Sequence, residues 1–196
     1  MVLVYIFDLD DTLYQNSYLS NPNFYPENAT EQEKYYSKFK PDLELKSLLN
    51  KLDGPKYILT NATYGHAEMV LERLNIKEHF KDIIARDTMY TMKPSSGAYQ
   101  FIMGKVMLKE KKSDLEYLFF DDLKRNLKMA KYLGWRTCLI KRLNNENLDE
   151  DKDEDKDEDE DEEYYIDYKF SNIKEALKHF INLCNYSLNF NNKMFV

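Results

Sequence analysis

The sequence predicts an α/β fold, a three-layer Rossmann-like sandwich in which helices cover both faces of a mainly parallel sheet. Short apolar runs of strand character alternate with longer segments of helical periodicity, which is typical of parallel crossover units. Several of the apolar runs end abruptly in polar residues, and ligands bind at the carboxyl ends of parallel strands. The length of 196 residues suits a single domain, residues 1–196, with one substantial core.

The first expected strand, residues 2–7, is a continuous apolar run that would be buried on both faces. Asp8, Asp10 and Asp11 follow it within four residues. If the extended conformation persists, the side chains of Asp8 and Asp10 lean to the same side. Carboxylates this close repel each other unless a cation bridges them or one keeps a proton, and both arrangements are useful in catalysis. A capping turn rich in aspartate is the structural alternative.

The remaining elements follow in order. Residues 15–40 are polar and can hold one helix, near 31–39, with Thr30 as its cap. The next helix starts at Pro41 and Asp42 and ends at Gly54. Apolar spacing predicts further helices over residues 67–74, 94–106, 123–133 and 173–183. Pro94 would lie in the first turn of the second of these, and Gly134 would be the C-terminal cap of the third. Further strands are expected at residues 56–59, 83–84, 115–120, 136–140 and 164–170.

The acidic tract at residues 149–163 holds thirteen acidic residues and two lysines and accounts for the net charge of −7, because the rest of the chain is mildly basic. A tract of like charges is expected to be a disordered, self-repelling loop, with a docking tail for a basic partner as the alternative. The excess of positive charge elsewhere is small and no nucleic-acid-binding motif is present, so no nucleic-acid partner is expected.

Two cysteines, Cys138 and Cys184, are too few for a disulfide framework and favour reduced thiols in a reducing compartment. The N-terminal apolar run is too short for a signal peptide or a membrane span. We therefore expect a cytoplasmic protein without a membrane partner. The oligomeric state is left open.

Four strand ends carry polar groups that would meet at one edge of the sheet: Asp8 with Asp10, Thr60 with Asn61, Lys93 beyond the third strand, and Asp121 with Asp122. The four carboxylates and the one ammonium of this edge carry a formal charge of −3, which a divalent cation and a proton held on Asp10 would reduce. An oxygen-rich site of this kind predicts Mg²⁺ as the cofactor. It favours phosphoryl transfer, with a carboxylate nucleophile, a second carboxyl group for the leaving group, and Thr60 and Lys93 on the remaining phosphoryl oxygens.

These motifs resemble those of the haloacid dehalogenase superfamily of phosphohydrolases, and they occur in that family's order. The matching segments are Phe-Asp-Leu-Asp-Asp-Thr-Leu-Tyr at 7–14, Leu-Thr-Asn-Ala at 59–62, Lys-Pro at 93–94, and Phe-Phe-Asp-Asp at 119–122 with Asn126. The resemblance implies that Asp8 is the nucleophile and a metal ligand, and that Asp10 is the acid/base and binds metal through its backbone carbonyl.

By the same resemblance, Asp122 is the third metal ligand, assisted by Asp121 directly or through water. Thr60 and Lys93 bind phosphate, with Asn61 beside them. The dehalogenases that named the superfamily lack an acid at the position of Asp10, so a phosphatase is favoured over an enzyme that cleaves carbon–halogen bonds.

A closer resemblance, over residues 56–143, is to the pyrimidine 5′-nucleotidase-like branch, whose members hydrolyse nucleoside monophosphates or other small phosphomonoesters. Those enzymes carry a sizeable helical cap, and residues 15–40 would be a reduced version of it. A reduced cap is compatible with phosphorylated macromolecules as substrates, or with a small-molecule site that is completed by oligomerisation. A phosphotransferase with the same motifs and a non-catalytic binding protein are separate alternatives. His66, near the second motif, could contact substrate or be merely structural.

Overall fold

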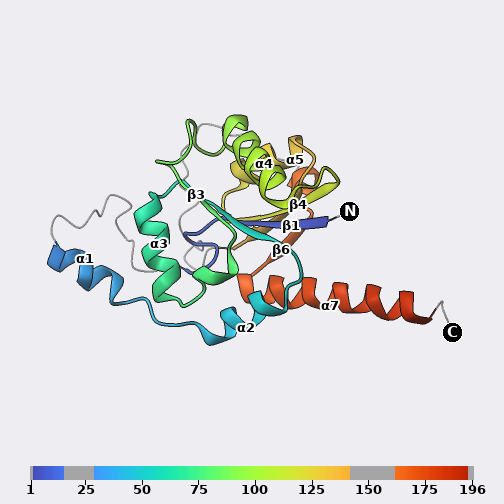
Figure 1. The fold of residues 1–196 in the computed structure, drawn as a ribbon, viewed down its shortest axis with the longest axis horizontal. Coiled ribbons are helices and arrows are strands. Elements are labelled where there is room, and N and C mark those ends of the chain that lie inside the picture. Colours follow the sequence, from blue (N-terminus) through green and yellow to red (C-terminus); the bar gives the residue numbers. More distant parts are fainter. Residues whose placement is uncertain (1, 16–28, 142–161, 194–196) are drawn as a thin grey trace.

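The computed structural model describes residues 2–15, 29–141 and 162–193, and its centre is a six-stranded parallel sheet (Figure 1). The strand order is β3-β2-β1-β4-β5-β6, so the first strand of the chain lies in the middle. The strands are β1 (Val2–Phe7), β2 (Lys56–Leu59), β3 (Ile83–Ile84), β4 (Leu115–Asp121), β5 (Arg136–Ile140) and β6 (Tyr168–Phe170). The predicted α/β sandwich is confirmed.

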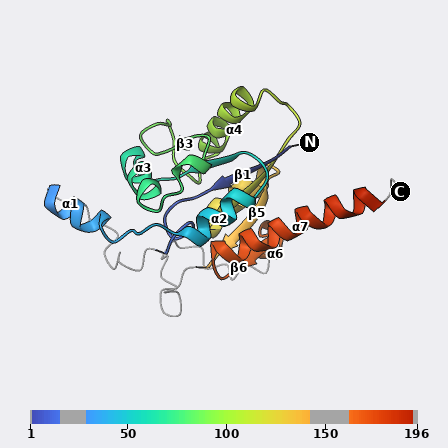
Figure 2. The ribbon, with the colours of Figure 1, turned by 60° about the horizontal axis from the view of Figure 1, so that its bottom comes forward.

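Helices cover both faces of this sheet. They are α1 (Ala29–Tyr36), α2 (Leu43–Lys51), α3 (Tyr64–Arg73), α4 (Ser96–Glu110), α5 (Lys124–Tyr132), α6 (Glu162–Tyr165) and α7 (Ile173–Lys193), with a 3₁₀ turn η1 (Lys77–His79). Apolar side chains of α2, α3 and α7 pack on one face, and those of α4, α5 and α6 on the other. Figure 2 shows α7 running outward from the sheet towards the C-terminus.

The alternation of side chains along β1 explains how one strand supports both layers. Tyr5 and Phe7 belong to the core cluster under α2, α3 and α7, whereas Val4 and Ile6 belong to the cluster under α4 and α5. All four side chains are almost completely buried, and β1 pairs with β2 on one side and with β4 on the other. Asp8 therefore directly follows a strand that is buried on both faces and paired on both sides.

Helix ends follow the expected local chemistry at several places. Asp42 caps α2 by accepting a hydrogen bond from the Leu45 N–H at 2.9 Å. Gly134 ends α5 with a φ of 82°, as predicted for a C-terminal cap. Helix α4 begins at Ser96, so Pro94 precedes the helix instead of occupying its first turn. Helix α1 begins at Ala29, so Thr30 lies inside the helix that it was expected to cap.

The predicted strand at residues 164–170 is wrong in its first half. Tyr165 belongs to helix α6 and is buried against the α4 and α5 layer, and only Tyr168–Phe170 pairs with β5. Thr137 and Asp167 cause the break. The Thr137 hydroxyl donates to the Tyr165 carbonyl at 2.6 Å, and Asp167 accepts the Thr137 N–H at 2.9 Å, which turns the chain before it reaches the sheet.

Two interpretations fall largely on residues outside those described. Of the expected reduced cap at residues 15–40, the structure describes residue 15 and residues 29–40, which include α1. Of the acidic tract at residues 149–163, it describes Glu162 and Glu163, which begin α6. The single-domain organisation, the reduced cap and the disorder of the tract stay predictions. No helix in the described part of the chain is long and apolar enough to cross a membrane.

Candidate active site

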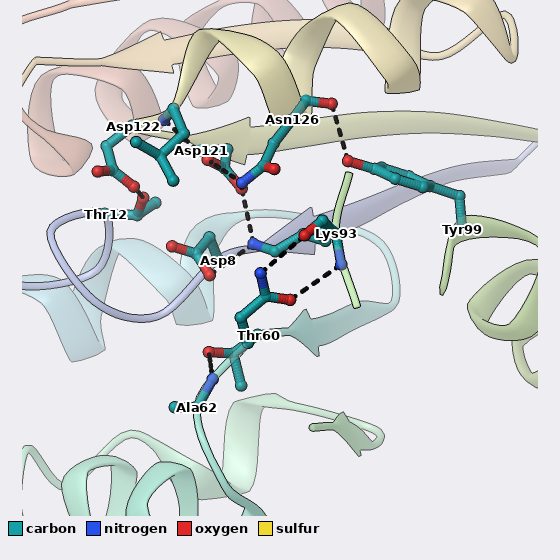
Figure 3. A network of polar contacts seen from close by, with 11 residues as sticks. Asp8, Thr12, Thr60, Ala62, Lys93, Tyr99, Asp121, Asp122 and Asn126 are labelled. Carbon is teal, nitrogen blue, oxygen red and sulfur yellow. Dashed lines mark hydrogen bonds and ion pairs between the residues drawn. The ribbon is translucent and has the colours of Figure 1, made fainter. Parts of the chain in front are cut away.

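The carboxyl ends of β1, β2 and β4 bring the predicted polar residues to one edge of the sheet (Figure 3). Asp8 directly follows β1, Thr60 and Asn61 follow β2, and Asp121 is the last residue of β4. Because the strands are parallel, their ends meet at the same edge. The Asp8 N–H donates to the Phe120 carbonyl at 2.9 Å, which fixes Asp8 beside the end of β4.

Lys93, from the loop between β3 and α4, bridges two of the carboxylates. Its Nζ donates to Asp8 Oδ1 and to Asp121 Oδ2, both at 2.7 Å, and its side chain is 1% exposed. Burial acts to lower the pKa of Lys93, but the carboxylates of Asp121 and Asp8 outweigh it and raise that pKa above its usual value. Lys93 is therefore a permanent cation at the centre of the site.

Asn61 holds the backbone of Lys93 in place. Its Nδ2 donates to the Lys93 carbonyl at 2.9 Å, and its Oδ1 accepts the Lys93 N–H at 2.9 Å. This reciprocal pair ties the end of β2 to the loop that carries the lysine. Asn61 lies beside Lys93 as expected, and its amide orients the lysine. Thr60, which is 1% exposed, accepts the Ala62 N–H at its hydroxyl oxygen at 3.0 Å.

Asp121 is fully buried and has its hydrogen-bonding capacity taken up by the protein. Besides Lys93, it accepts the Leu123 N–H at 2.8 Å, and Asn126 Nδ2 lies 3.0 Å from each of its carboxylate oxygens. Tyr99 of α4 in turn donates to the Asn126 carbonyl at 2.8 Å. This set of bonds orients Asp121 towards Lys93, which fits an indirect role at a metal better than a direct one.

Asp8, Asp121 and Asp122 form a group that could hold a metal ion, because one carboxylate oxygen from each lies within 4.8 Å of the others. Asp122 is only partly buried, and the Thr12 hydroxyl donates to its Oδ1 at 3.2 Å. Three carboxylates fit a hard divalent cation such as Mg²⁺. The Asp10 side chain lies outside this group, which agrees with a contribution from its backbone only.

The surroundings of Asp8 show why a cation belongs there. Burial raises the pKa of Asp8 well above its usual value, and the carboxylates of Asp121, Asp122 and Asp10 add to this effect, whereas the Lys93 ammonium opposes it. A single lysine therefore does not compensate Asp8 and its three neighbouring carboxylates. A further positive charge beside Asp8 would favour the ionised form that a nucleophile requires.

Asp10 has a different environment. Its Oδ1 accepts hydrogen bonds from the Tyr14 hydroxyl and from His66 Nε2, the latter at 3.0 Å. Burial acts to raise the pKa of Asp10, but the hydrogen bond and charge of His66, the Tyr14 hydrogen bond and the Lys93 charge outweigh it and lower that pKa. These surroundings favour the Asp10 carboxylate, in contrast to the expectation that a proton is held on it.

Sequence reasoning did not find several residues that complete the site. They are Thr12, Tyr14, Tyr36 and Tyr99, together with the contact between His66 and Asp10. Thr12 and Tyr14 lie within the first motif, so their proximity in the sequence was a usable signal. Tyr36 and Tyr99 reach the site from helices far away in the chain, and nothing in the sequence marks them among sixteen tyrosines.

Comparisons with known proteins agree with this geometry. A family model described as haloacid dehalogenase-like hydrolase matches residues 15–140. A search of curated proteins finds no match. Among solved structures, an L-2-haloacid dehalogenase from Xanthobacter autotrophicus with chloropropionic acid covalently bound is 14% identical with a TM-score of 0.55, over 76% of this chain and 81% of that one.

Two further structures are similar over almost their whole length. The putative HAD-hydrolase YfnB from Bacillus subtilis, bound to magnesium, is 14% identical with a TM-score of 0.58, over 92% of this chain and 99% of that one. A putative beta-phosphoglucomutase from Thermotoga maritima is 16% identical with a TM-score of 0.62, over 91% and 98%. Identities this low show a shared fold, and the family model covers more than half of the sequence. The chain therefore belongs to the haloacid dehalogenase-like hydrolases.

Proposed function

We propose that the protein is a Mg²⁺-dependent phosphomonoester hydrolase that acts through an aspartyl-phosphate on Asp8. The observation that carries this proposal is the arrangement around Asp8: Lys93 bonded to it at 2.7 Å, Asp121 and Asp122 within reach of a shared cation, and Asp10 two residues away. A carboxylate nucleophile, a fixed ammonium and a cation site are the groups that phosphoryl transfer to a carboxylate needs.

Asp8, Asp122 and the backbone carbonyl of Asp10 would hold the metal, with Asp121 assisting. Their hard oxygen donors suit Mg²⁺, and no histidine or cysteine lies in the group. When bound, Mg²⁺ would neutralise the repulsion between the Asp8 carboxylate and the phosphate.

In the first step a carboxylate oxygen of Asp8 attacks phosphorus while the bond from phosphorus to the leaving oxygen breaks. The leaving oxygen takes a proton from Asp10, whose protonated form is favoured by the negative charge of the phosphate bound beside it. Lys93 and the Thr60 hydroxyl hold the other phosphoryl oxygens, and Asn61 keeps Lys93 in position. In the second step the Asp10 carboxylate takes a proton from water as that water attacks the phosphorus, which frees Asp8. The surroundings that lower the pKa of Asp10 keep it in the ionised form that can accept this proton.

Asp10 also supports a phosphatase over a dehalogenase, although the structural neighbours include dehalogenases and a putative beta-phosphoglucomutase. A leaving alkoxide needs a proton and a leaving halide does not. The fixed contacts of Asp10 with Tyr14 and His66 are those of a residue held for proton transfer. As substrate we infer a small phosphomonoester in the cytoplasm, such as a nucleoside monophosphate, from the resemblance to the nucleotidase-like branch.

The test is phosphate release from nucleoside monophosphates, sugar phosphates, an aryl phosphate and phosphopeptides, with Mg²⁺ or with a chelator. We expect Mg²⁺-dependent release from a small phosphomonoester, reduced by about 10⁴-fold or more in Asp8→Asn because the nucleophile is lost. Asp11→Asn is the matched control, since it makes the same change three residues away at a position with a φ of 56°, which asparagine tolerates.

Each other outcome has a defined meaning. Full activity in Asp8→Asn would rule out the proposed nucleophile. Release from phosphopeptides alone would replace the small substrate with a phosphoprotein. Release from none of the compounds by the parent protein would favour a non-catalytic binding protein.

A further inference from the structure

A chain of hydrogen bonds connects Asp10 with helix α1. His66 Nε2 lies 3.0 Å from Asp10 Oδ1, and the Tyr36 hydroxyl lies 3.0 Å from His66 Nδ1. Tyr14 donates to the same Asp10 oxygen and lies 3.4 Å from His66 Nε2. The bonds therefore run from the segment after β1, through the first turn of α3, to the last residue of α1.

The chemistry of Asp10 fixes the direction of the bond from His66. A carboxylate accepts only, so Nε2 carries the proton that bonds to Asp10, and Nδ1 shares a second hydrogen bond with the Tyr36 hydroxyl. Burial, together with Tyr35 and Asp10, raises the pKa of Tyr36 to about 12, so its hydroxyl remains a donor at physiological pH. Both ring nitrogens of His66 have a hydrogen-bond partner, which restricts the ring to one orientation.

Packing restricts the ring further. Its centroid lies 5.7 Å from that of Tyr36 and 6.2 Å from that of Tyr35. The Arg73 guanidinium of α3 bonds to both carboxylate oxygens of Glu33 in α1 at 2.9 Å, so α1 is attached to α3 at a second point. The His66 side chain is 19% exposed. The imidazole is therefore held between two helices that are fixed to each other.

Within the described residues, the hydrogen bonds to the Asp10 side chain end on Oδ1. The Asp10 side chain is 32% exposed, so the carboxylate is held at Oδ1 without being enclosed by the protein. We propose that His66, itself held by Tyr36, is a positioning residue that directs the second carboxylate oxygen of Asp10 towards the leaving group of the substrate. This proposal rests on the phosphatase function proposed above and gives α1 a role in the reaction.

A positioning role predicts a particular pattern of loss. Substrate binding depends on Lys93 and Thr60, so His66 variants should keep KM and lose kcat. Loss in kcat/KM should depend on the leaving group, because kcat/KM covers the steps through transfer of phosphate to Asp8. A poor leaving group needs the proton from Asp10, whereas dinitrophenolate leaves without one.

The experiment compares an alkyl phosphate with 2,4-dinitrophenyl phosphate in His66→Phe, which keeps a ring of similar size. We expect kcat/KM for the alkyl phosphate to fall by about 10- to 100-fold, which is part of what general acid catalysis contributes. We expect kcat/KM for the dinitrophenyl ester to fall by less than about 3-fold. His66→Gln, whose amide N–H can donate to Asp10, should restore part of the loss. Tyr36→Phe should show a weaker form of the same pattern.

Tyr35→Phe is the matched control, because it removes a hydroxyl from the adjacent residue of α1 and leaves the bond between Tyr36 and His66 in place. In an Asp10→Asn background, His66→Phe should add almost nothing, since its effect acts through Asp10. Equal losses for both substrates, or full additivity with Asp10→Asn, would overturn the positioning role. Thermal unfolding shows which variants are folded, and Tyr36→Phe still tests the proposal if His66→Phe is not.

A second measurement separates this proposal from the proposed function. The ¹⁵N signals of the His66 imidazole, assigned by their loss in His66→Phe, should show a protonated Nε2, and they should move in Asp10→Asn and in Tyr36→Phe but not in Tyr35→Phe. If the parent protein releases no phosphate and these shifts occur, the phosphatase function fails and the contact stands. If Asp10→Asn leaves the signals unchanged, the contact itself is refuted.

Discussion

Lys93 places one buried ammonium group among the carboxylates of the site. Taking a lysine and two carboxylates out of water is costly, and the cost is recovered only when each charge keeps well-placed partners. Asp121 meets this condition through Leu123 and Asn126, and Lys93 meets it through Asp8 and Asp121. The site is therefore sensitive to loss of any one charge, for reasons of stability as well as of catalysis.

Replacing Lys93 with methionine should destabilise the protein by about 3–5 kcal/mol, because two buried carboxylates would lose their shared cation. Lys109→Met is the control, since Lys109 pairs with Asp82 at 2.9 Å on the surface, with side chains 43% and 30% exposed, and should cost less than about 1 kcal/mol. Urea unfolding at neutral pH measures the free energy of unfolding of both variants. Equal effects would mean that the buried ion pairs contribute no more than a surface pair.

At the scale of single residues, the sequence was informative where a residue follows a strand. Asp8, Thr60 and Asp121 stand at the point where apolar runs become polar, so both their position and their convergence could be predicted. Tyr36 and Tyr99 could not, because each reaches the site by the packing of a helix. The roles of the converging residues remain predictions until they are tested.

Elements were predictable where burial is uniform and not where a side chain redirects the backbone. Strands β2 and β5 match their predicted bounds because their apolar runs are bounded by clear breaks. The run at residues 164–170 looks equally strand-like, but Thr137 and Asp167 bind its backbone and turn it. A contact across thirty residues decided the local structure, and no local pattern carries that information.

Asp167 gives a pH-dependent prediction at this scale. Burial acts to raise its pKa, but the bonds from Lys131 and from Thr137 outweigh it and lower that pKa. A lowered pKa in the folded state stabilises the protein above the unfolded-state value of about 3.9, and the contribution is lost as pH falls through the folded-state value. Asp167→Asn should therefore cost about 1 kcal/mol at pH 7 and progressively less below pH 4.

Thermal unfolding of the parent and Asp167→Asn from pH 7 to pH 3 checks this prediction. Asp114→Asn is the control, at an exposed position just before β4. A difference between parent and Asp167→Asn that stays constant with pH would show that the ionised form of Asp167 does not matter.

At the scale of the whole molecule, the net charge of −7 describes one segment and not the folded body. Deleting residues 149–160 leaves a chain with a small positive charge, and it shortens only the connection between β5 and α6. Loop length affects stability weakly, so we expect a change in Tm of less than about 3 °C and unchanged kcat/KM. Calorimetry and the phosphate-release assay measure these quantities, and a large loss of activity would show that the tract acts in the reaction.

The position of β1 in the sheet has a consequence during synthesis on the ribosome. The central strand emerges first, but Val2 pairs with Leu115, which is translated more than a hundred residues later. At about 5–20 residues per second, one side of β1 waits roughly 5–20 s for its partner. An unpaired apolar strand is prone to pair with other chains, so the nascent protein is most exposed to aggregation in this interval.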